Sequence, residues 1–179
     1  MKDGLFKTIL YTILGIGIMT ALMTLTSMTT PIEGVYIQLA YGYLALFAGV
    51  AGAIPAAIVG FTGHVLFDLI YTDHLWLSWA LSTGALGFVF GFAIRRKSLR
   101  QGVFSEHDMI RFNVVQAVVN IAIFGLIAPT LDVLFYQHST TIVFTQGWIA
   151  SIINLLTVAV FGTITLKLYA NYKLKQNKQ

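Results

Sequence analysis

Six apolar stretches alternate with short polar ones along the 179-residue chain. A helix that crosses a bilayer needs roughly 20 apolar residues, and most of the stretches approach that length. They cover about residues 5–28, 38–52, 55–71, 75–94, 109–134 and 145–168. The second and third are short and meet at a tight turn over Gly52–Pro55, so we expect them to be tilted or partly re-entrant. The pattern predicts an all-α integral membrane protein with six transmembrane helices, in a single domain over residues 1–179.

Turn and capping residues mark several ends of these segments. Thr29–Pro31 ends the first, and Pro55 is well suited to the first position of the third. Ser105, with Asp108 three residues later, is typical of a helix N-terminus. Pro129 predicts a kink near the far end of the fifth segment. The run Arg95–Arg100 predicts a solvated basic loop between the fourth and fifth segments.

The composition supports a membrane location. The chain is 57% hydrophobic and only 10% charged, whereas a soluble domain carries about 25% charged residues. Cysteine is absent, which excludes disulfides and thiolate metal sites. No cleavage pattern of small residues follows the first segment, so we expect no cleavable signal peptide.

The basic residues predict the orientation of the chain. All eleven Lys and Arg fall at the N-terminal end, around the connection between the fourth and fifth segments, or at and beyond the end of the sixth. Positive residues concentrate on the cytoplasmic side, so both termini are expected in the cytoplasm. A re-entrant hairpin in place of segments two and three fits this pattern only if it returns to the same face. The net charge of +4 therefore reads as a topology signal, and no nucleic-acid partner is expected.

Two ionisable residues lie inside the apolar third segment. His64 and Asp68 are four residues apart and share one helix face. An ionisable pair in a membrane helix is costly unless it faces a partner or a polar cavity. A purely structural pair and a ligand-facing pair both satisfy that condition. Trp76 near a boundary is equally consistent with an interfacial belt, and Asn120 or Asn154 with a hydrogen bond between helices.

Other motifs, present or absent, narrow the range of functions that the chain can have. Gly17 and Ala21 form a small-xxx-small pattern, which lets another helix approach closely. The chain has no phosphate-binding Gly-Lys-Ser/Thr loop, no His-Glu-x-x-His and no Gly-x-Ser-x-Gly. It is therefore not expected to be an enzyme or to hydrolyse ATP itself. His64, His74 and His138 match no metal-site signature, so no metal is expected.

The stretch from Gln38 to Trp79 resembles the substrate-binding (S) components of energy-coupling factor (ECF) transporters, in the riboflavin-type and uncharacterised group. The motifs are Gln38-x-x-Tyr41, Leu44-Ala45-Leu46-Phe47-Ala48, the Gly52–Pro55 turn, Gly60-x-x-Gly63-His64-x-x-x-Asp68 and Trp76-x-Ser78-Trp79. Length, the six segments and the orientation agree with that family over the whole chain.

The resemblance implies a multi-pass protein of the bacterial plasma membrane that binds a vitamin from outside. Its partners would be a transmembrane scaffold (T) subunit and two cytoplasmic ATPases, which bind the ATP, so no cofactor is expected on this chain. Gly17 and Ala21 would pack against the scaffold, although Gly replaces the commoner first Ala. The ligand would lie in the outer half of the bundle, under the loop between the first two helices.

The residues expected to bind the ligand share an outer location and either a ring or a hydrogen-bonding group. They are Gln38, Tyr41, His64, Asp68, Trp76, Trp79, Asn120 and Asn154. Such a set suits a flat polar heteroaromatic ring, and hydroxymethylpyrimidine (a thiamine precursor) or pyridoxine is favoured. Cobalamin and riboflavin stay open as ligands. A stand-alone proton-coupled carrier and a non-transporting subunit of a membrane assembly are the competing functions. The lack of an obvious inverted repeat counts against the carrier.

Overall fold

The computed structural model describes residues 2–72 and 74–179, with side chains from residue 5 onward. In this part of the chain, four helices are long and apolar enough to cross a membrane: Leu5–Leu25, Ala53–Thr72, Glu106–Tyr136 and Thr140–Gln176. Two shorter apolar helices, Ala40–Ala51 and Leu77–Ala93, occupy the other two predicted positions. The protein is thus a mostly helical, multi-pass membrane protein. The count of six crossings and the cytoplasmic termini stay predictions.

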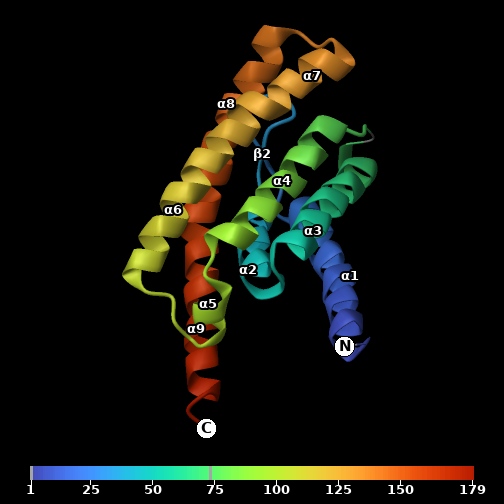
Figure 1. The fold of residues 1–179 in the computed structure, drawn as a ribbon. Coiled ribbons are helices and arrows are strands. Elements are labelled where there is room, and N and C mark those ends of the chain that lie inside the picture. Colours follow the sequence, from blue (N-terminus) through green and yellow to red (C-terminus); the bar gives the residue numbers. More distant parts are fainter. Residues whose placement is uncertain (1, 73) are drawn as a thin grey trace.

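The elements follow one another in a simple order (Figure 1). The α-helices are α1 (Lys2–Leu25), α2 (Ala40–Ala51), α3 (Ala53–Phe67), α4 (Leu77–Ala93), α5 (Arg96–Arg100), α6 (Glu106–Asn120), α7 (Ala128–Tyr136), α8 (Thr140–Thr157) and α9 (Thr163–Gln176). Three wider, π-helical stretches continue or join them: η1 (Asp68–Thr72) after α3, η2 (Ile121–Ile127) between α6 and α7, and η3 (Val158–Gly162) between α8 and α9. A short antiparallel ribbon pairs β1 (Met28–Thr29) with β2 (Tyr36–Ile37).

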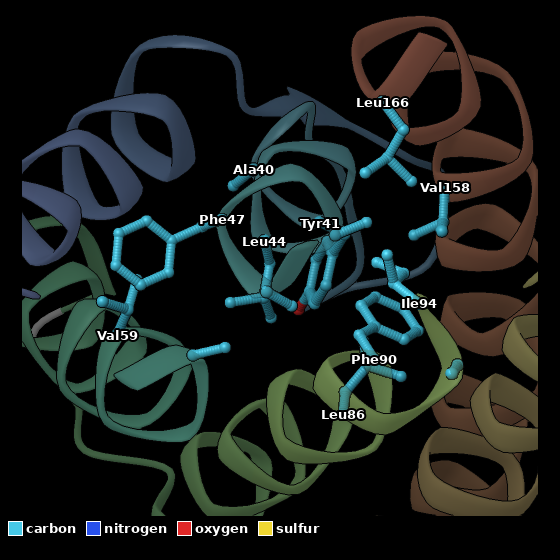
Figure 2. Close-up of a cluster of buried hydrophobic side chains, with 14 of the residues drawn as sticks. Ala40, Tyr41, Leu44, Phe47, Val59, Leu86, Phe90, Ile94, Val158 and Leu166 are labelled. Carbon is cyan, nitrogen blue, oxygen red and sulfur yellow. The ribbon is translucent and has the colours of Figure 1, made fainter. Parts of the chain in front are cut away.

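Helix α2 lies at the centre of the bundle. It contacts α1, α3, α4 and the segment from η3 to α9. Figure 2 shows its Tyr41, Leu44 and Phe47 among side chains from α3, from α4 and from that last segment. A helix that is apolar on all sides is buried inside a protein or a membrane. With 12 residues, α2 is about 18 Å long, well short of the roughly 30 Å hydrocarbon core. It is therefore a core element packed by protein on most sides.

Helix α1 is packed on one side only. Met19 and Met23 are fully buried in the core, whereas Leu5, Ile13 and Ile18 are exposed. Only 22% of its most apolar 18-residue stretch is buried inside the protein. Most of this helix is therefore open to lipid or to a partner protein.

The two ends of the molecule differ in their chemistry. Both termini and α5 lie toward one end, and the turn between α7 and α8 lies at the other, together with the end of α3 (Figure 1). The elements with Lys and Arg gather at the first end. This arrangement is the one that the charge pattern of the sequence predicts.

The basic run between the fourth and fifth segments is exposed at Arg95, Lys97 and Arg100, as predicted, but the prediction of a loop was wrong. Residues Arg96–Arg100 form the short helix α5. The Arg96 and Arg100 guanidinium groups both donate to the Val50 carbonyl, over 3.1 and 2.9 Å, at the end of α2. The last carbonyls of a helix lack partners within it and carry partial negative charge, so cations cap them. Burial, and then the adjacent Arg100, lowers the pKa of Arg96 from its ordinary value.

The predicted capping residues of the fifth segment are confirmed, but the helix begins earlier than predicted. Ser105 accepts from the Asp108 backbone N–H, and the Asp108 carboxylate accepts from the Ser105 backbone N–H, which is a complete capping box. The helix therefore begins at Glu106 rather than near residue 109. It runs through Pro129 to Tyr136, and the π-helical η2 ends two residues before the proline. Wider turns before a proline accommodate the hydrogen bond that its missing N–H removes.

Other predicted boundaries shift by a few residues, and one shifts more. The first helix ends at Leu25, and the second and fourth begin at Ala40 and Leu77. The sixth segment is helical from Thr140 to Gln176, well beyond the predicted 145–168. Hydropathy marks where the chain leaves the hydrocarbon, whereas a helix of Leu, Lys and Gln continues into water.

A tight turn between α2 and α3 leads to a first prediction. Gly52 has φ 101° and ψ −177°, a conformation that is essentially limited to glycine. We expect Gly52→Ala to destabilise the protein by about 1–3 kcal/mol and to lower its thermal midpoint in detergent, followed by circular dichroism. Gly17→Ala is the matched control, because an added Cβ there meets nothing within 4 Å. An unchanged midpoint for Gly52→Ala would contradict this account of the turn.

Candidate ligand-binding site

A cavity of about 500 Å³ lies at the end of the bundle away from both termini. Its walls come from the segment after β1, from α2, α3 and η1, from the start of α4, and from α8. Seven of the eight residues expected to bind the ligand line it: Gln38, Tyr41, His64, Asp68, Trp76, Trp79 and Asn154. The structure thus brings together residues that lie up to 116 positions apart in sequence, from Gln38 to Asn154.

The His64–Asp68 pair forms the polar centre of the wall. Its side chains are 8% and 3% exposed, and His64 Nε2 lies 3.5 Å from Asp68 Oδ1. His64 Nδ1 lies 2.7 Å from Thr83 Oγ1, and Thr83 donates its single hydroxyl hydrogen to the Trp79 carbonyl. This arrangement fixes the ring with one nitrogen on α4 and the other beside the carboxylate.

Asp68 also holds the connection before α4. It lies where α3 passes into η1, and its Oδ2 accepts from the Trp76 backbone N–H over 2.9 Å. The side chain thus has two neighbours, His64 and the Trp76 backbone, and both line the cavity. A carboxylate keeps further lone pairs after two such contacts, so Asp68 has capacity to accept from a ligand.

Aromatic rings form much of the remaining wall. The Tyr41 ring meets Phe124 edge-on at 5.6 Å, and the Trp79 ring lies 5.9 Å from the same phenylalanine. Trp76 packs against the ring of His138 at 5.0 Å. Flat ligands bind well between such rings, because aromatic faces provide large contact areas with a preferred geometry.

Gln38, just before α2, and Asn154, on α8, each bring an amide group to the cavity. The Gln38 amide nitrogen donates to Ser27 Oγ at 2.8 Å and to the Met23 carbonyl at 3.3 Å, so it ties α2 to the end of α1. Asn154 is 3% exposed on α8. Both residues are therefore positioned by the fold, and each retains amide groups that can bond to a ligand.

Asn120 is the one expected residue that the structure does not place in the cavity lining. Its amide nitrogen donates to the Gln116 carbonyl and side-chain oxygens at 2.9 and 3.0 Å. Gln116 in turn donates to the Leu155 carbonyl of α8, and Asn113 to Thr163 of α9. This polar stripe joins helices, which is a common role for amides inside membrane bundles.

The structure adds lining residues that the sequence did not predict. They include Glu33, His138, Val143, Gln146 and Ala150. Gln146 donates to the Glu33 carbonyl over 2.8 Å, which joins the loop between the ribbon strands to α8. Gln146, Ala150 and Asn154 follow each other at intervals of four on one face of α8, and that spacing was the available signal.

The charged residues that line the cavity are acidic. Glu33 and Asp68 contribute carboxylates, and no Lys or Arg lines the cavity among the residues that the structure describes. Within the same residues, no three His, Asp or Glu side chains come close enough to hold a metal ion. Burial, Tyr71 and Glu33 raise the pKa of Tyr36 at the cavity rim above its usual value, so its hydroxyl stays protonated near neutral pH. The site is thus suited to neutral or cationic ligands.

The small-xxx-small pair lies on a different surface. Gly17 and Ala21 are exposed on α1, and a Cβ added at Gly17 meets nothing within 4 Å. The intervening Met19 and Thr20 face the core instead. The pair is therefore unused in the packing of this chain.

Comparison with known proteins gives a family model and relatives that agree with one another. The family model "ECF-type riboflavin transporter, S component" matches residues 7–171. A UPF0397 protein of Lactococcus lactis subsp. cremoris is 41% identical over 175 residues, which cover 98% of this chain and 96% of the relative. UPF0397 proteins of Enterococcus faecalis and Lactobacillus helveticus are 37% and 38% identical, with coverage of 98% of this chain and 97% or 95% of theirs. No solved structure gives a significant match.

The match extends over nearly the whole chain, and the helical membrane fold agrees with it. Family members are transport subunits and not enzymes. The chain therefore belongs to the family of ECF-type riboflavin transporter S components, and it is a substrate-binding membrane subunit of an ECF transporter.

Proposed function

We propose that this S component captures a small, uncharged heteroaromatic vitamin from outside the cell. Hydroxymethylpyrimidine or pyridoxine is the favoured ligand. The observation that carries the proposal is the cavity itself, where aromatic rings surround a buried carboxylate and no Lys or Arg among the described residues takes part.

The chemistry of the wall supports a neutral ring with donor groups. Asp68 accepts from a ring amine or a hydroxymethyl group, and His64 and Asn154 supply further polar contacts. Tyr41, Trp76 and Trp79 offer ring faces and edges for stacking. A phosphate or carboxylate on the ligand would meet Asp68 and Glu33 without a compensating cation, which is unfavourable in a poorly solvated site.

Riboflavin is the second candidate ligand, and two observations favour it. The matching family model carries its name, and the cavity of about 500 Å³ lies within the range of about 300–1,000 Å³ for pockets that hold drug-sized ligands. The same volume disfavours cobalamin, which is much larger than a drug-sized molecule.

Delivery to the cytoplasm would require partners. We place the scaffold subunit against the exposed Gly17–Ala21 face of α1, with two ATPases that bind ATP on the cytoplasmic side. The chain itself would need no cofactor. A stand-alone proton-coupled carrier built on His64 and Asp68 is the competing mechanism, and it alone predicts uptake by the isolated protein in liposomes with a proton gradient.

A titration of the purified protein without ATPases tests the proposal. We expect nanomolar to micromolar affinity for hydroxymethylpyrimidine or pyridoxine. Pyridoxine 5′-phosphate should bind at least about a hundredfold more weakly than pyridoxine, because its charge is close to Asp68. Riboflavin is titrated in parallel. Equal binding of pyridoxine and its phosphate would contradict the charge argument, and binding of riboflavin alone would select the second candidate.

A further inference from the structure

A second buried carboxylate, Asp132 on α7, lies just behind the cavity wall. Asp132 is fully buried and does not line the cavity. Its Oδ1 accepts from the Ser78 hydroxyl, and its Oδ2 accepts from Trp79 Nε1 over 2.7 Å. A buried carboxylate in an apolar bundle is costly unless its acceptors are used. Here both oxygens are used, and both donors are consecutive side chains at the start of α4.

The bonds of Asp132 are not those of a helix cap. Two backbone N–H groups at this end of α4 have other acceptors: Asp68 for Trp76, and the Tyr136 hydroxyl for Leu77 at 3.1 Å. Asp132 receives only side-chain donors. The carboxylate therefore controls the orientation of side chains, in particular the indole of Trp79.

The indole that Asp132 holds is part of the ligand cavity. Trp79 lines the cavity and packs on the fully buried Phe124, which also supports the cavity-lining Tyr41. A hydrogen bond to one edge of an indole fixes its rotation about the bond to Cβ. Trp79 is only partly buried, so without that bond the ring is held by packing alone, including its contact with Phe124.

We propose that Asp132 is a positioning residue, which fixes the Trp79 indole in the cavity wall through its bond to Nε1. The proposal uses the proposed function only in taking this cavity as the ligand site. Asp132 itself does not touch the ligand.

Fluorescence without any ligand tests the proposal directly. The chain has three tryptophans, so Trp76→Phe with Trp148→Phe leaves Trp79 as the sole reporter. In that background, Asp132→Ala is expected to increase acrylamide quenching and lower the anisotropy of Trp79. Asp132→Asn should restore values near those of the parent, because its amide oxygen still accepts from the indole while Ser78 turns to accept from the amide nitrogen.

The control is Thr130→Val on the same helix, an exposed residue whose hydroxyl donates to the Leu126 carbonyl one turn earlier. If Asp132→Ala does not fold, Asp132→Glu replaces it, since the extra methylene displaces the carboxylate and keeps its charge. Trp79 signals no different from those of Thr130→Val would overturn the proposal. So would an Asn variant as impaired as the Ala variant.

A double-mutant cycle with pyridoxine as the probe then separates positioning from general stability. We expect Asp132→Ala to lower affinity about tenfold beside Trp79 and less than about twofold in a Trp79→Phe background, where no indole remains to be held. Equal losses in both backgrounds would mean that Asp132 acts only through stability. Because the fluorescence result needs no ligand, absence of pyridoxine binding would count against the proposed function alone.

Discussion

Replacing Asp68 with alanine is expected to weaken ligand binding by about a hundredfold or more. Asp68 is 2% exposed and is the buried carboxylate that lines the cavity itself. Its loss removes the acceptor for a ligand donor and also leaves the Trp76 backbone N–H without its 2.9 Å partner. Calorimetry or ligand fluorescence with the vitamin that binds in the titration above measures the change.

Two further variants make this result specific. Asp68→Asn keeps the shape of the side chain and one acceptor for the Trp76 backbone N–H. Any loss of affinity in this variant therefore measures how much the negative charge contributes to contacts with the ligand and with His64. Glu106→Gln removes an exposed carboxylate at the start of α6 and should leave affinity unchanged. Wild-type affinity in Asp68→Ala would remove Asp68 from the site, and with it the main polar contact that we assign to the ligand.

A leucine at Gly17 is expected to prevent assembly with the scaffold and ATPases while ligand binding continues. A Cβ at this position meets nothing within 4 Å in the chain itself, so Gly17→Leu should change ligand affinity by no more than about twofold. A helix of a partner that approaches a small-xxx-small face closely has no room for the added side chain. We expect co-purification of the partners to fall at least about tenfold, and vitamin uptake by cells to fall with it.

Ile164→Trp provides the matched control for added bulk. Ile164 is 52% exposed on α9, away from the Gly17 surface, so assembly and uptake should persist. If Gly17→Leu assembles and transports normally, the scaffold binds elsewhere. If it loses ligand binding as well, the face of α1 contributes to the fold in a way that the open space around Gly17 does not indicate.

The sequence was a good guide to helices and to most of the site, for identifiable reasons. Apolar runs must be helical in hydrocarbon, since only a helix pairs every backbone group locally. His64 and Asp68 were recognisable because ionisable groups are rare in such a run. The boundaries were harder to predict, as the extension of α9 to Gln176 shows, because the hydropathy signal ends at the membrane surface and the helix does not.

Residues whose role depends on contacts between distant segments were not predictable in the same way. Asn120 and Asn154 look alike in sequence, yet Asn120 bonds within α6 and Asn154 lines the cavity. Gln146 reaches the Glu33 carbonyl, and Asp132 reaches α4, only because helices far apart in sequence pack together. Periodicity gives the face of a helix, and tertiary packing decides what that face meets.

The arginines of α5 have a practical consequence for mapping how the chain inserts. Arg96 and Arg100 carry part of the charge asymmetry that should direct insertion. They also donate hydrogen bonds to the Val50 carbonyl. Neutralising them would disturb biogenesis and native packing at once, so a reporter fusion on such a variant would give an ambiguous readout. Lys97 is exposed and is the better position at which to alter the charge. Sidedness assays should therefore begin there, with both arginines left intact.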